Sequence, residues 1–328
     1  MNEIEYAGPF KEHLKNHVQL KQAVGYKYFA EALHLKRFDR FTQKKYPDAI
    51  CLTKEIILDW CSKHPHETRA NQCSRASMTR QFSKYLDSIG LKAYILPKDQ
   101  YPQGPQYVPH IYSPEELRRF FAQTDHCHYC KECPSRHLIM PLFFRMIYQC
   151  GLRVREARLL KVGDVDLSNG VLSIQHSKKD NSRLVPMANS LAKRSLEYSA
   201  NVHALASPED YFFPGLGGKP MTISNVYHNF RRFLWRAGIG HGGRGSGPRI
   251  HDFRHAYAVH CLKKWSEQGK DLAVFLPMLR TYMGHDSFQD TAYYLRLTAD
   301  VFPDITLKLE GLFAGIIPEL AGDFHEAH

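Results

Sequence analysis

A proline-rich stretch, residues 96–117 (LPKDQYPQGPQYVPHIYSPEEL), limits the fold of this chain more than any other feature. It holds five prolines among scattered apolar residues, and proline lacks the N–H that helix and sheet interiors require. Ser113 and Pro114 near its end suit the N-cap and the first position of a helix. We therefore expect an extended linker between one domain at 1–107 and another at 108–328, each long enough to enclose a core.

The part before the linker has the pattern of consecutive helices. Apolar residues recur at helical spacing in residues 10–23 and 28–43. Thr53 suits the N-cap of a third helix, and Gly90 suits the residue that follows the end of a fourth. The first domain is therefore expected to be helical.

The fourth of these helices carries a basic stripe. Arg75, Arg80 and Lys84 stand beside the apolar residues Met78 and Phe82. A helix with one apolar and one basic face can lie in a DNA groove, so we expect these three cations to contact DNA. The alternative is an ordinary surface helix.

The part after the linker mixes helices with a small sheet. Residues 138–150 form a strongly apolar helical segment, and residues 171–187 have the pattern of two short strands joined by a polar turn. Further helices flank the glycine-rich segment 241–247. We expect a chain that is mainly α with a small antiparallel β-sheet, divided into a helical domain and an α+β domain.

The net charge favours a polyanionic partner. The chain carries +11 at pH 7 and has a pI near 9.2, which favours nucleic acid. Residues 1–110 contribute +6, residues 111–300 contribute +9 and residues 301–328 contribute −4. The basic character therefore belongs to both parts of the chain and not to one basic tail.

The sequence shows no signal peptide, no membrane-spanning segment and no cysteine pattern typical of a disulfide-rich protein. The N-terminus has no apolar signal core, and no run of about 18 apolar residues occurs. We expect a soluble, cytoplasmic protein with no membrane partner. The eight cysteines are too few for a disulfide scaffold in a chain of this size, so most should be free thiols.

Four short segments of the second part carry residue types suited to phosphoryl transfer: GLRVREARLL, HDFRH, MGH and TAYYLRL. Guanidinium groups can bind phosphate oxygens and stabilise charge in the transition state. A tyrosine can act as a covalent nucleophile, and a lysine or histidine can protonate a leaving alkoxide. Each segment alone also has an ordinary explanation as a surface arginine, a chance pair or core packing.

In this order the segments resemble the catalytic domain of the tyrosine recombinase (phage integrase) family. The resemblance covers roughly residues 110–300 and includes a hairpin, SKKDNSRLVP, between the first two segments. The family has an arginine in a GLR turn, a hairpin lysine, an HxxR pair, a His or Trp after a Gly, and then a tyrosine. The family spacing of nine from His285 gives the second of two adjacent tyrosines, Tyr294, and five back from Arg183 gives Lys178.

Two arginines, a lysine, two histidines and a tyrosine match the family's catalytic positions: Arg153, Lys178, His251, Arg254, His285 and Tyr294. The resemblance implies that the arginines bind the scissile phosphate and that the tyrosine attacks it, leaving a 3′-phosphotyrosine and a free 5′-hydroxyl. The lysine would protonate the 5′-oxygen, His251 would assist proton transfer at the tyrosine, and His285 would hydrogen-bond the phosphate. Because the phosphotyrosine bond conserves the energy, no metal, ATP or other cofactor is expected.

The resemblance also implies how such an enzyme assembles. The first domain would be the family's core-binding domain, and the enzyme would act on double-stranded DNA as a homo-tetramer across two duplexes. Accessory DNA-bending proteins are candidate further partners. Residues 303–328 have an amphipathic helical pattern, and we expect this tail to dock on a neighbouring protomer. The expected outcome is integration or excision of a mobile element.

One departure from the family concerns the connection between two motifs. The 31 residues from Arg254 to His285 exceed the usual family distance. We therefore expect an insertion of several residues in the helical connection, with the catalytic set unaffected.

Two other functions fit the same residues. A type IB topoisomerase shares the covalent chemistry and would relax DNA, although the small catalytic domain favours recombination. A non-cutting accessory DNA-binding protein is the other alternative, and the presence of all the catalytic elements argues against it.

Two further segments hold candidate binding residues. DHCHYCKECPSRH spaces Cys127, Cys130 and Cys133 three apart among histidines, which is a weak candidate zinc site because no second ligand pair stands elsewhere. HGGRGSGPR places Arg244 and Arg249 in a glycine-rich loop that we expect beside the DNA backbone. A plain surface loop is the alternative there.

Overall fold

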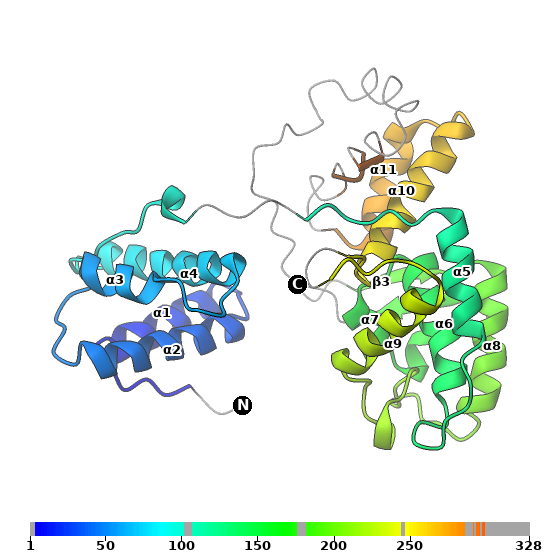
Figure 1. Ribbon diagram of the computed structural model, residues 1–328, viewed down its shortest axis with the longest axis horizontal. Helices are drawn as coiled ribbons and strands as arrows, with labels where there is room; N and C mark the ends of the chain where they lie inside the picture. The colour runs from blue at the N-terminus through cyan, green and yellow to red at the C-terminus, as the bar shows by residue number, and fades with distance from the viewer. Residues whose placement is uncertain are drawn as a thin grey trace. The chain divides into compact units, whose positions relative to one another are not determined.

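The computed structural model describes residues 4–101, 107–175, 182–243, 247–285, 291, 293–295, 297 and 298. The chain divides into two compact units, Met1–Tyr107 and Val108–His328 (Figure 1). Apolar side chains form a separate core in each unit. Among the helices in these ranges, none has the length and apolar content needed to cross a lipid bilayer.

The first unit is a group of helices around an aromatic core: α1 (Lys11–Ala23), α2 (Phe29–Lys45), α3 (Lys54–Cys61) and α4 (Arg69–Ser88), followed by the short η1 (Lys98–Gln100). The long helix α4 contacts the other three α-helices. In the core, the buried rings of Phe38 and Phe82 lie with their centroids 6.1 Å apart. The helices expected from the apolar spacing are confirmed.

The predicted helix ends are also confirmed. Thr53 Oγ1 accepts a backbone N–H at the start of α3 (3.3 Å), and Gly90 follows α4 with a left-handed φ of 80°. After the linker, Ser113 Oγ accepts the N–H of Glu116 at 3.1 Å, and the Glu116 carboxylate accepts the N–H of Ser113 at 2.8 Å. This reciprocal capping box fixes the start of α5 (Pro114–Asp125).

The second unit is built around a central apolar helix, α6. Its elements after α5 are α6 (Arg136–Gln149), α7 (Val154–Leu159), η2 (Val162–Asp164), β1 (Val165–Asp166), β2 (Val171–Ile174), β3 (Arg183–Pro186), α8 (Asn189–Val202), η3 (Leu216–Gly218), α9 (Ile223–Arg236), α10 (Asp252–Glu267) and α11 (Leu272–Met283). Eight of the fourteen residues of α6 are buried, and α5, α8 and α10 pack against it (Figure 1).

The sheet of the second unit is small and antiparallel, in the order β1–β2–β3. Leu172 and Val185 are paired across β2 and β3, and their buried side chains belong to the core of the second unit. One face of the sheet therefore packs against this core. The two predicted strands are confirmed. The sequence pattern missed β1, because a strand of two residues is too short to show an alternation. The fold class is therefore the predicted one, mainly helical with a small antiparallel sheet.

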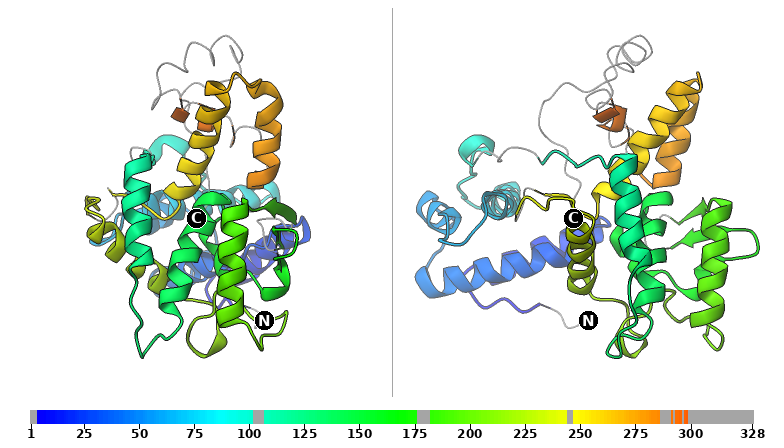
Figure 2. Two further views of the ribbon diagram at one scale, coloured as in Figure 1. Left: turned by 90° about the vertical axis from the view of Figure 1, so that its right-hand side faces the viewer. Right: turned by 45° about the vertical axis from the view of Figure 1, so that its right-hand side comes forward.

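A satellite core forms where α10 and α11 run side by side (Figure 2). Leu262 of α10 and Leu276 of α11 are buried there together with Tyr294 and Leu295. The described residues between 291 and 298 are helical. The candidate nucleophile is thus held by an apolar core, and the polar residues of the site gather at its edge.

Candidate active site

The GLR turn places the first candidate arginine at the start of α7. Gly151 has a φ of +58°, and a Cβ there would lie 2.9 Å from the Tyr257 ring, so a larger residue would both strain the backbone and clash. Arg153 is the N-cap residue of α7. Its guanidinium donates to Glu156 Oε1 at 3.0 Å and to the carbonyl of Gly284 at 3.1 Å, and its side chain is 25% exposed. An anion can therefore reach it from solvent.

The second candidate arginine, Arg254, lies on α10 and is fully buried. Its Nη1 donates to the carbonyl of Gly151 (2.5 Å), and its Nη2 donates to the carbonyl of Met283 (2.7 Å). One guanidinium thus joins the GLR turn to the MGH turn, which are more than a hundred residues apart in the chain. Both arginines donate to carbonyls of the MGH turn, Arg153 to Gly284 and Arg254 to Met283.

A carboxylate between the arginines was not predicted. Glu156 is buried and receives a two-pronged contact from Arg183, with Nη1 to Oε1 at 2.9 Å and Nη2 to Oε2 at 2.8 Å. Burial alone would raise the pKa of Glu156. The hydrogen bond and charge of Arg183, with smaller contributions from Arg254 and Arg153, outweigh it and lower the pKa to about 2. Glu156 stands three residues after Arg153, so helical spacing was the signal that could have found it.

The MGH turn holds the histidine and the tyrosine together. Gly284 ends α11 in the left-handed conformation, with φ 64°. His285 is buried, and its Nδ1 lies 2.9 Å from Thr291 Oγ1. The His285 ring stacks on the ring of Tyr294, with centroids 5.5 Å apart and planes 16° from parallel. Tyr294 is only 1% exposed, so the candidate nucleophile is covered in this DNA-free structure.

A second histidine also contacts this tyrosine. The His255 ring lies 5.5 Å from the Tyr294 ring and 4.7 Å from the ring of His251, the residue that precedes α10. His255 is not among the residues expected at the site from the sequence, and its ring contacts those of both His251 and Tyr294. The adjacent Tyr293 is half-buried, with its ring 6.2 Å from that of His255.

The charge balance of this cluster is positive. Arg153, Arg183 and Arg254 interact with the single carboxylate of Glu156. Among the described contacts, three guanidiniums surround one carboxylate, so this group is rich in positive charge. Such a group suits an anion like a phosphodiester.

Some predicted residues cannot be placed. Lys178, Arg244 and the tail at 303–328 lie outside the described residues. Arg249 is half-buried, and its backbone N–H donates to Asp252 Oδ2 (2.8 Å) at the start of α10. Its predicted DNA contact stays a prediction.

The structure corrects the basic stripe predicted on α4. Arg75 is buried, with Nη2 donating to Glu67 Oε2 (2.5 Å) and to the carbonyl of Ser62 (2.9 Å). Its guanidinium is therefore committed to the protein, and the prediction of a DNA contact is wrong for this residue. Arg80 donates to the carbonyls of Leu96 (2.7 Å) and Pro97, so it fastens the segment after α4. Lys84 alone of the three predicted cations is exposed.

The cysteine-rich segment forms the connection from α5 to α6 and is not helical. Cys127, Cys130 and Cys133 are free and half-buried, and the Cys130 thiol donates to Glu132 Oε2 (2.7 Å). Within the described parts of the chain, no group of three or more His, Cys, Asp or Glu side chains is arranged to hold a metal ion. The predicted weak zinc site gains no support from this geometry.

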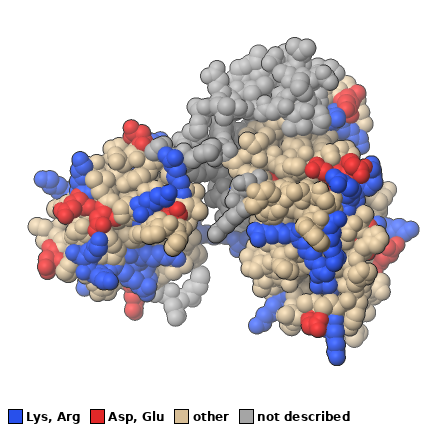
Figure 3. Space-filling view, viewed as in Figure 1, with Lys and Arg blue, Asp and Glu red and all other residues tan. Residues whose placement is uncertain are grey.

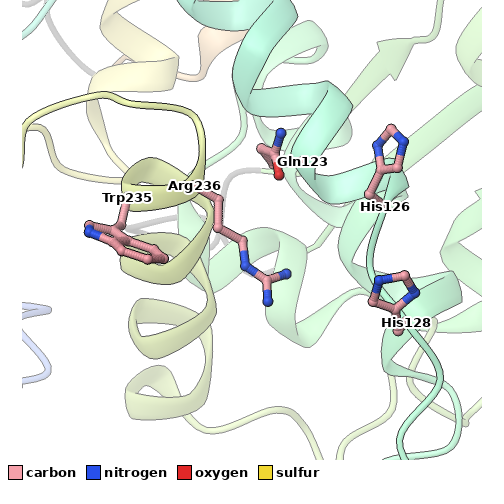
Figure 4. A pocket seen from close by; sticks show the side chains of 5 residues that line it. All are labelled: Gln123, His126, His128, Trp235 and Arg236. Atoms are coloured by element: carbon pink, nitrogen blue, oxygen red, sulfur yellow. The ribbon is translucent and has the colours of Figure 1, made fainter.

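An open hollow of about 490 Å³ lies beside that segment and contains none of the predicted catalytic residues. It is lined by Gln123, His126, His128, Trp235 and Arg236 (Figure 4). The basic side chains of the second unit gather instead over α9 in the view of Figure 3, where Arg231 and Arg236 are exposed. This surface charge agrees with a polyanionic partner.

Comparison with known proteins gives a consistent picture. The family model described as the phage integrase family matches residues 112–300. The Sinorhizobium fredii protein y4rB, assigned as an integrase/recombinase, is 27% identical over 307 residues, which are 92% of this chain and 97% of that protein. The tyrosine recombinase XerD of Proteus mirabilis is 30% identical over 158 residues, 47% of this chain and 46% of that protein.

Solved structures share the fold at low sequence identity. The Tn1549 transposon integrase in complex with a circular intermediate DNA matches with a TM-score of 0.63 and 14% identity, over 86% of this chain and 94% of that one. The XerH recombinase in its post-cleavage complex with difH matches with a TM-score of 0.59 and 19% identity, over 85% and 79% of the two chains. The residues matched by the family model include the described cluster around Glu156.

Proposed function

The chain belongs to the phage integrase family and is a tyrosine recombinase that breaks and rejoins DNA, and from this premise we propose that Tyr294 is its nucleophile. The observation that carries this assignment is the stacking of Tyr294 on His285, directly beside the turn to which Arg153 and Arg254 both donate. The ring contacts described for Tyr293 are with His255 and Tyr294.

The reaction divides among these residues as follows. The exposed edge of Arg153 receives a non-bridging phosphate oxygen, and Arg254 stabilises the charge that grows on the phosphorane-like transition state. The Tyr294 oxygen bonds to phosphorus while the bond to the 5′-oxygen breaks. The tyrosine proton passes to the imidazole of His251, and Lys178 gives a proton to the 5′-oxygen. His285 holds a phosphate oxygen.

Cleavage then requires a rearrangement on DNA. Tyr294 is 1% exposed and Arg254 is fully buried. We infer that the surroundings of Tyr294 rearrange when DNA binds, so that the phenol oxygen and the phosphate can meet. An enzyme whose nucleophile is covered until the substrate binds would not cut DNA at random.

The test is covalent capture on a nicked suicide substrate carrying the recombination site. Wild type and Tyr293→Phe are expected to form a protein–DNA adduct that survives denaturation, and Tyr294→Phe is expected to form none. Adduct formation by Tyr294→Phe together with its loss in Tyr293→Phe would move the nucleophile to Tyr293. Tyr293→Phe is the matched control because it removes a hydroxyl one residue away.

We further propose that two duplexes are joined in a homo-tetramer, with residues 303–328 docking on a neighbouring protomer and Lys84, Arg244 and Arg249 contacting DNA. Support for assembly comes from a fold neighbour, a lambda integrase described as a dimer bound to a core site. Removing the residues from about 305 onward should leave single-site binding intact and abolish the tetrameric complex in a native gel. Unchanged tetramer formation would refute the docking.

The substrate is proposed to be a mobile element that is integrated or excised, with accessory DNA-bending proteins setting direction in the cell. A topoisomerase of type IB chemistry is the alternative. The two are separated by incubating the enzyme with a supercoiled plasmid that lacks the site. Relaxation as fast as recombination of the cognate site would favour the topoisomerase.

A further inference from the structure

The C-terminal end of α11 is held in an unusual way by three arginines. The last carbonyls of a helix have no intrahelical partner, and here three successive ones each accept from a different arginine. The pairs are Tyr282 O with Arg183 Nε (2.9 Å), Met283 O with Arg254 Nη2 (2.7 Å) and Gly284 O with Arg153 Nη2 (3.1 Å). Two of these arginines are assigned to the phosphate, and the third has no assigned role.

Arg183 itself is not placed to touch DNA. Its side chain is 7% exposed. Both of its Nη groups donate to Glu156, and its Nε donates to Tyr282. A Cβ added to Gly284 would come within 2.9 Å of Arg183 Nη1, so the turn passes directly over the guanidinium. Its action on a phosphate must therefore be indirect.

We propose that Arg183 is a positioning residue for strand cleavage. By compensating the Glu156 carboxylate it leaves the charge of Arg153 available to the scissile phosphate, and by binding Tyr282 it fixes the turn that carries His285. This inference rests on the proposed function of Arg153 and His285.

The electrostatic half of the proposal follows from the contacts of Glu156. Its Oε1 accepts from both Arg153 and Arg183, and its Oε2 accepts from Arg183 and from the Arg153 backbone N–H. If Arg183 is lost, the buried carboxylate depends on Arg153, which already donates to its Oε1, and on the field of Arg254, whose Nη groups are bound to backbone carbonyls. Arg153 would then pair with the Glu156 carboxylate and would no longer be available to bind the scissile phosphate.

The geometric half follows from a second link between β3 and α11. Tyr282 Oη donates to the carbonyl of Pro186 at 3.1 Å, while the Tyr282 carbonyl accepts from Arg183. The first and last residues of β3 thus bind one residue of α11. His285 is three residues further on, so a shift of this anchor displaces it from the phosphate.

The experiment is a double-mutant cycle on the full chain. Single-turnover cleavage of the suicide substrate is compared for wild type, Arg183→Met, Glu156→Gln and the double variant Glu156→Gln/Arg183→Met. Circular dichroism melts and DNA dissociation constants are measured for each. Arg183→Met should slow cleavage about 100-fold, as expected for the loss of one transition-state contact, with the DNA dissociation constant changed less than about threefold because the side chain is buried.

The decisive expectation is partial rescue. A glutamine at position 156 keeps an oxygen that can accept the Arg153 backbone N–H at the start of α7, but it removes the negative charge that would bind the Arg153 guanidinium. The double variant should therefore cleave about tenfold faster than Arg183→Met. If Arg183 had a purely structural role, adding Glu156→Gln to Arg183→Met would leave the cleavage rate unchanged or lower it further. The proposal is overturned if both folded variants cleave at the same rate or the double variant is slower.

A conservative variant guards against misfolding. Arg183→Lys keeps the charge but cannot make the two-pronged contact, and it should cleave faster than Arg183→Met. If Arg183→Met does not fold, the cycle is repeated with Arg183→Lys, where the absence of rescue by Glu156→Gln overturns the idea equally. Failure of wild type itself to form an adduct would refute the proposed function, whereas a normal wild-type adduct with no rescue refutes only this inference.

Discussion

Each unit of this protein buries a glutamate against arginine, and the two clusters differ in their charge balance. In the first unit the Glu67 carboxylate pairs with a single arginine, Arg75, among the described ion pairs, with side chains 11% and 8% exposed, and it also accepts the backbone N–H of His64. In the second unit Glu156 is shared by Arg183 and Arg153, and Arg254 adds to the local field. One pair is neutral, and the other group carries surplus positive charge.

This difference separates an arginine that supports the fold from one that serves the substrate. Arg75 also stacks over Trp60, with its guanidinium carbon 5.1 Å from the ring centroid. Its remaining donors contact the backbone carbonyls of Trp60 and Ser62 and the Nε2 of His64, so its guanidinium is occupied within the protein. The described cluster around Glu156 gathers three guanidiniums near one carboxylate, which is the kind of surrounding that a phosphate-binding site requires.

The largest expected effect distinguishes the two clusters by one substitution. Arg153→Lys keeps a charge but loses the planar fork, so single-turnover cleavage should fall about 100- to 1,000-fold. Arg75→Lys, the matched control, should leave the cleavage rate of the folded enzyme unchanged. Both rates come from adduct formation on the suicide substrate. Equal losses in the two variants would contradict the division into a catalytic and a structural cluster.

The second effect is on folding. Arg75→Met leaves the nearly buried Glu67 without its partner and should reduce the free energy of unfolding by about 3–5 kcal/mol. Urea titrations followed by circular dichroism measure it. Glu67→Gln/Arg75→Met removes the stranded charge and should recover part of the loss. A loss of less than about 1 kcal/mol in Arg75→Met would mean that the pair behaves like an exposed salt bridge.

The third effect is a pH dependence of the free energy of unfolding that arises from Glu156 in the second cluster. Because the folded pKa of Glu156 is lowered from 4.5 to about 2, its ionisation contributes about 3 kcal/mol to folding above pH 4.5. That contribution declines as the pH falls from about 4.5 to about 2. Unfolding titrations over this range should show wild type losing stability faster than Glu156→Gln. Parallel curves for the two proteins would contradict the shift.

The smallest effect concerns the one exposed cation of the predicted stripe. Lys84→Gln should weaken DNA binding only severalfold and reduce the slope of log affinity against log salt by about one. Fluorescence anisotropy at several salt concentrations measures this. A substitution at Lys84 that leaves the salt slope unchanged would show that α4 does not approach a phosphate there.

The structure brings described members of the catalytic set to one turn, whereas it removes one cation from the predicted basic stripe, and the difference has a physical reason. The catalytic positions were assigned from motif spacings that the family resemblance supplies. The stripe was inferred from basic residues standing beside apolar ones on one helix, without following the helical period. Arg75 and Phe82 are seven residues apart, which is two helical turns, so Arg75 lies on the buried face. That period was available in the sequence and would have corrected the prediction.

Other features of the site could not be predicted from the chain. The contact between the His255 and Tyr294 rings joins two motifs about 40 residues apart, and its geometry depends on how α10 and α11 pack. The contacts of Arg183 also could not be predicted, because β3 and the end of α11 are distant in the sequence and are brought together only by the tertiary fold.

The three arginine contacts at the end of α11 have a consequence for how this chain can vary in length. The carbonyls of residues 282–284 are held from β3, α7 and α10, and none of these contacts depends on the path of the chain between α10 and α11. Additional residues in that connection would lengthen the end of the α10–α11 helix pair that is remote from His285, without moving the turn that precedes His285. The long separation between Arg254 and His285 is therefore compatible with an intact site.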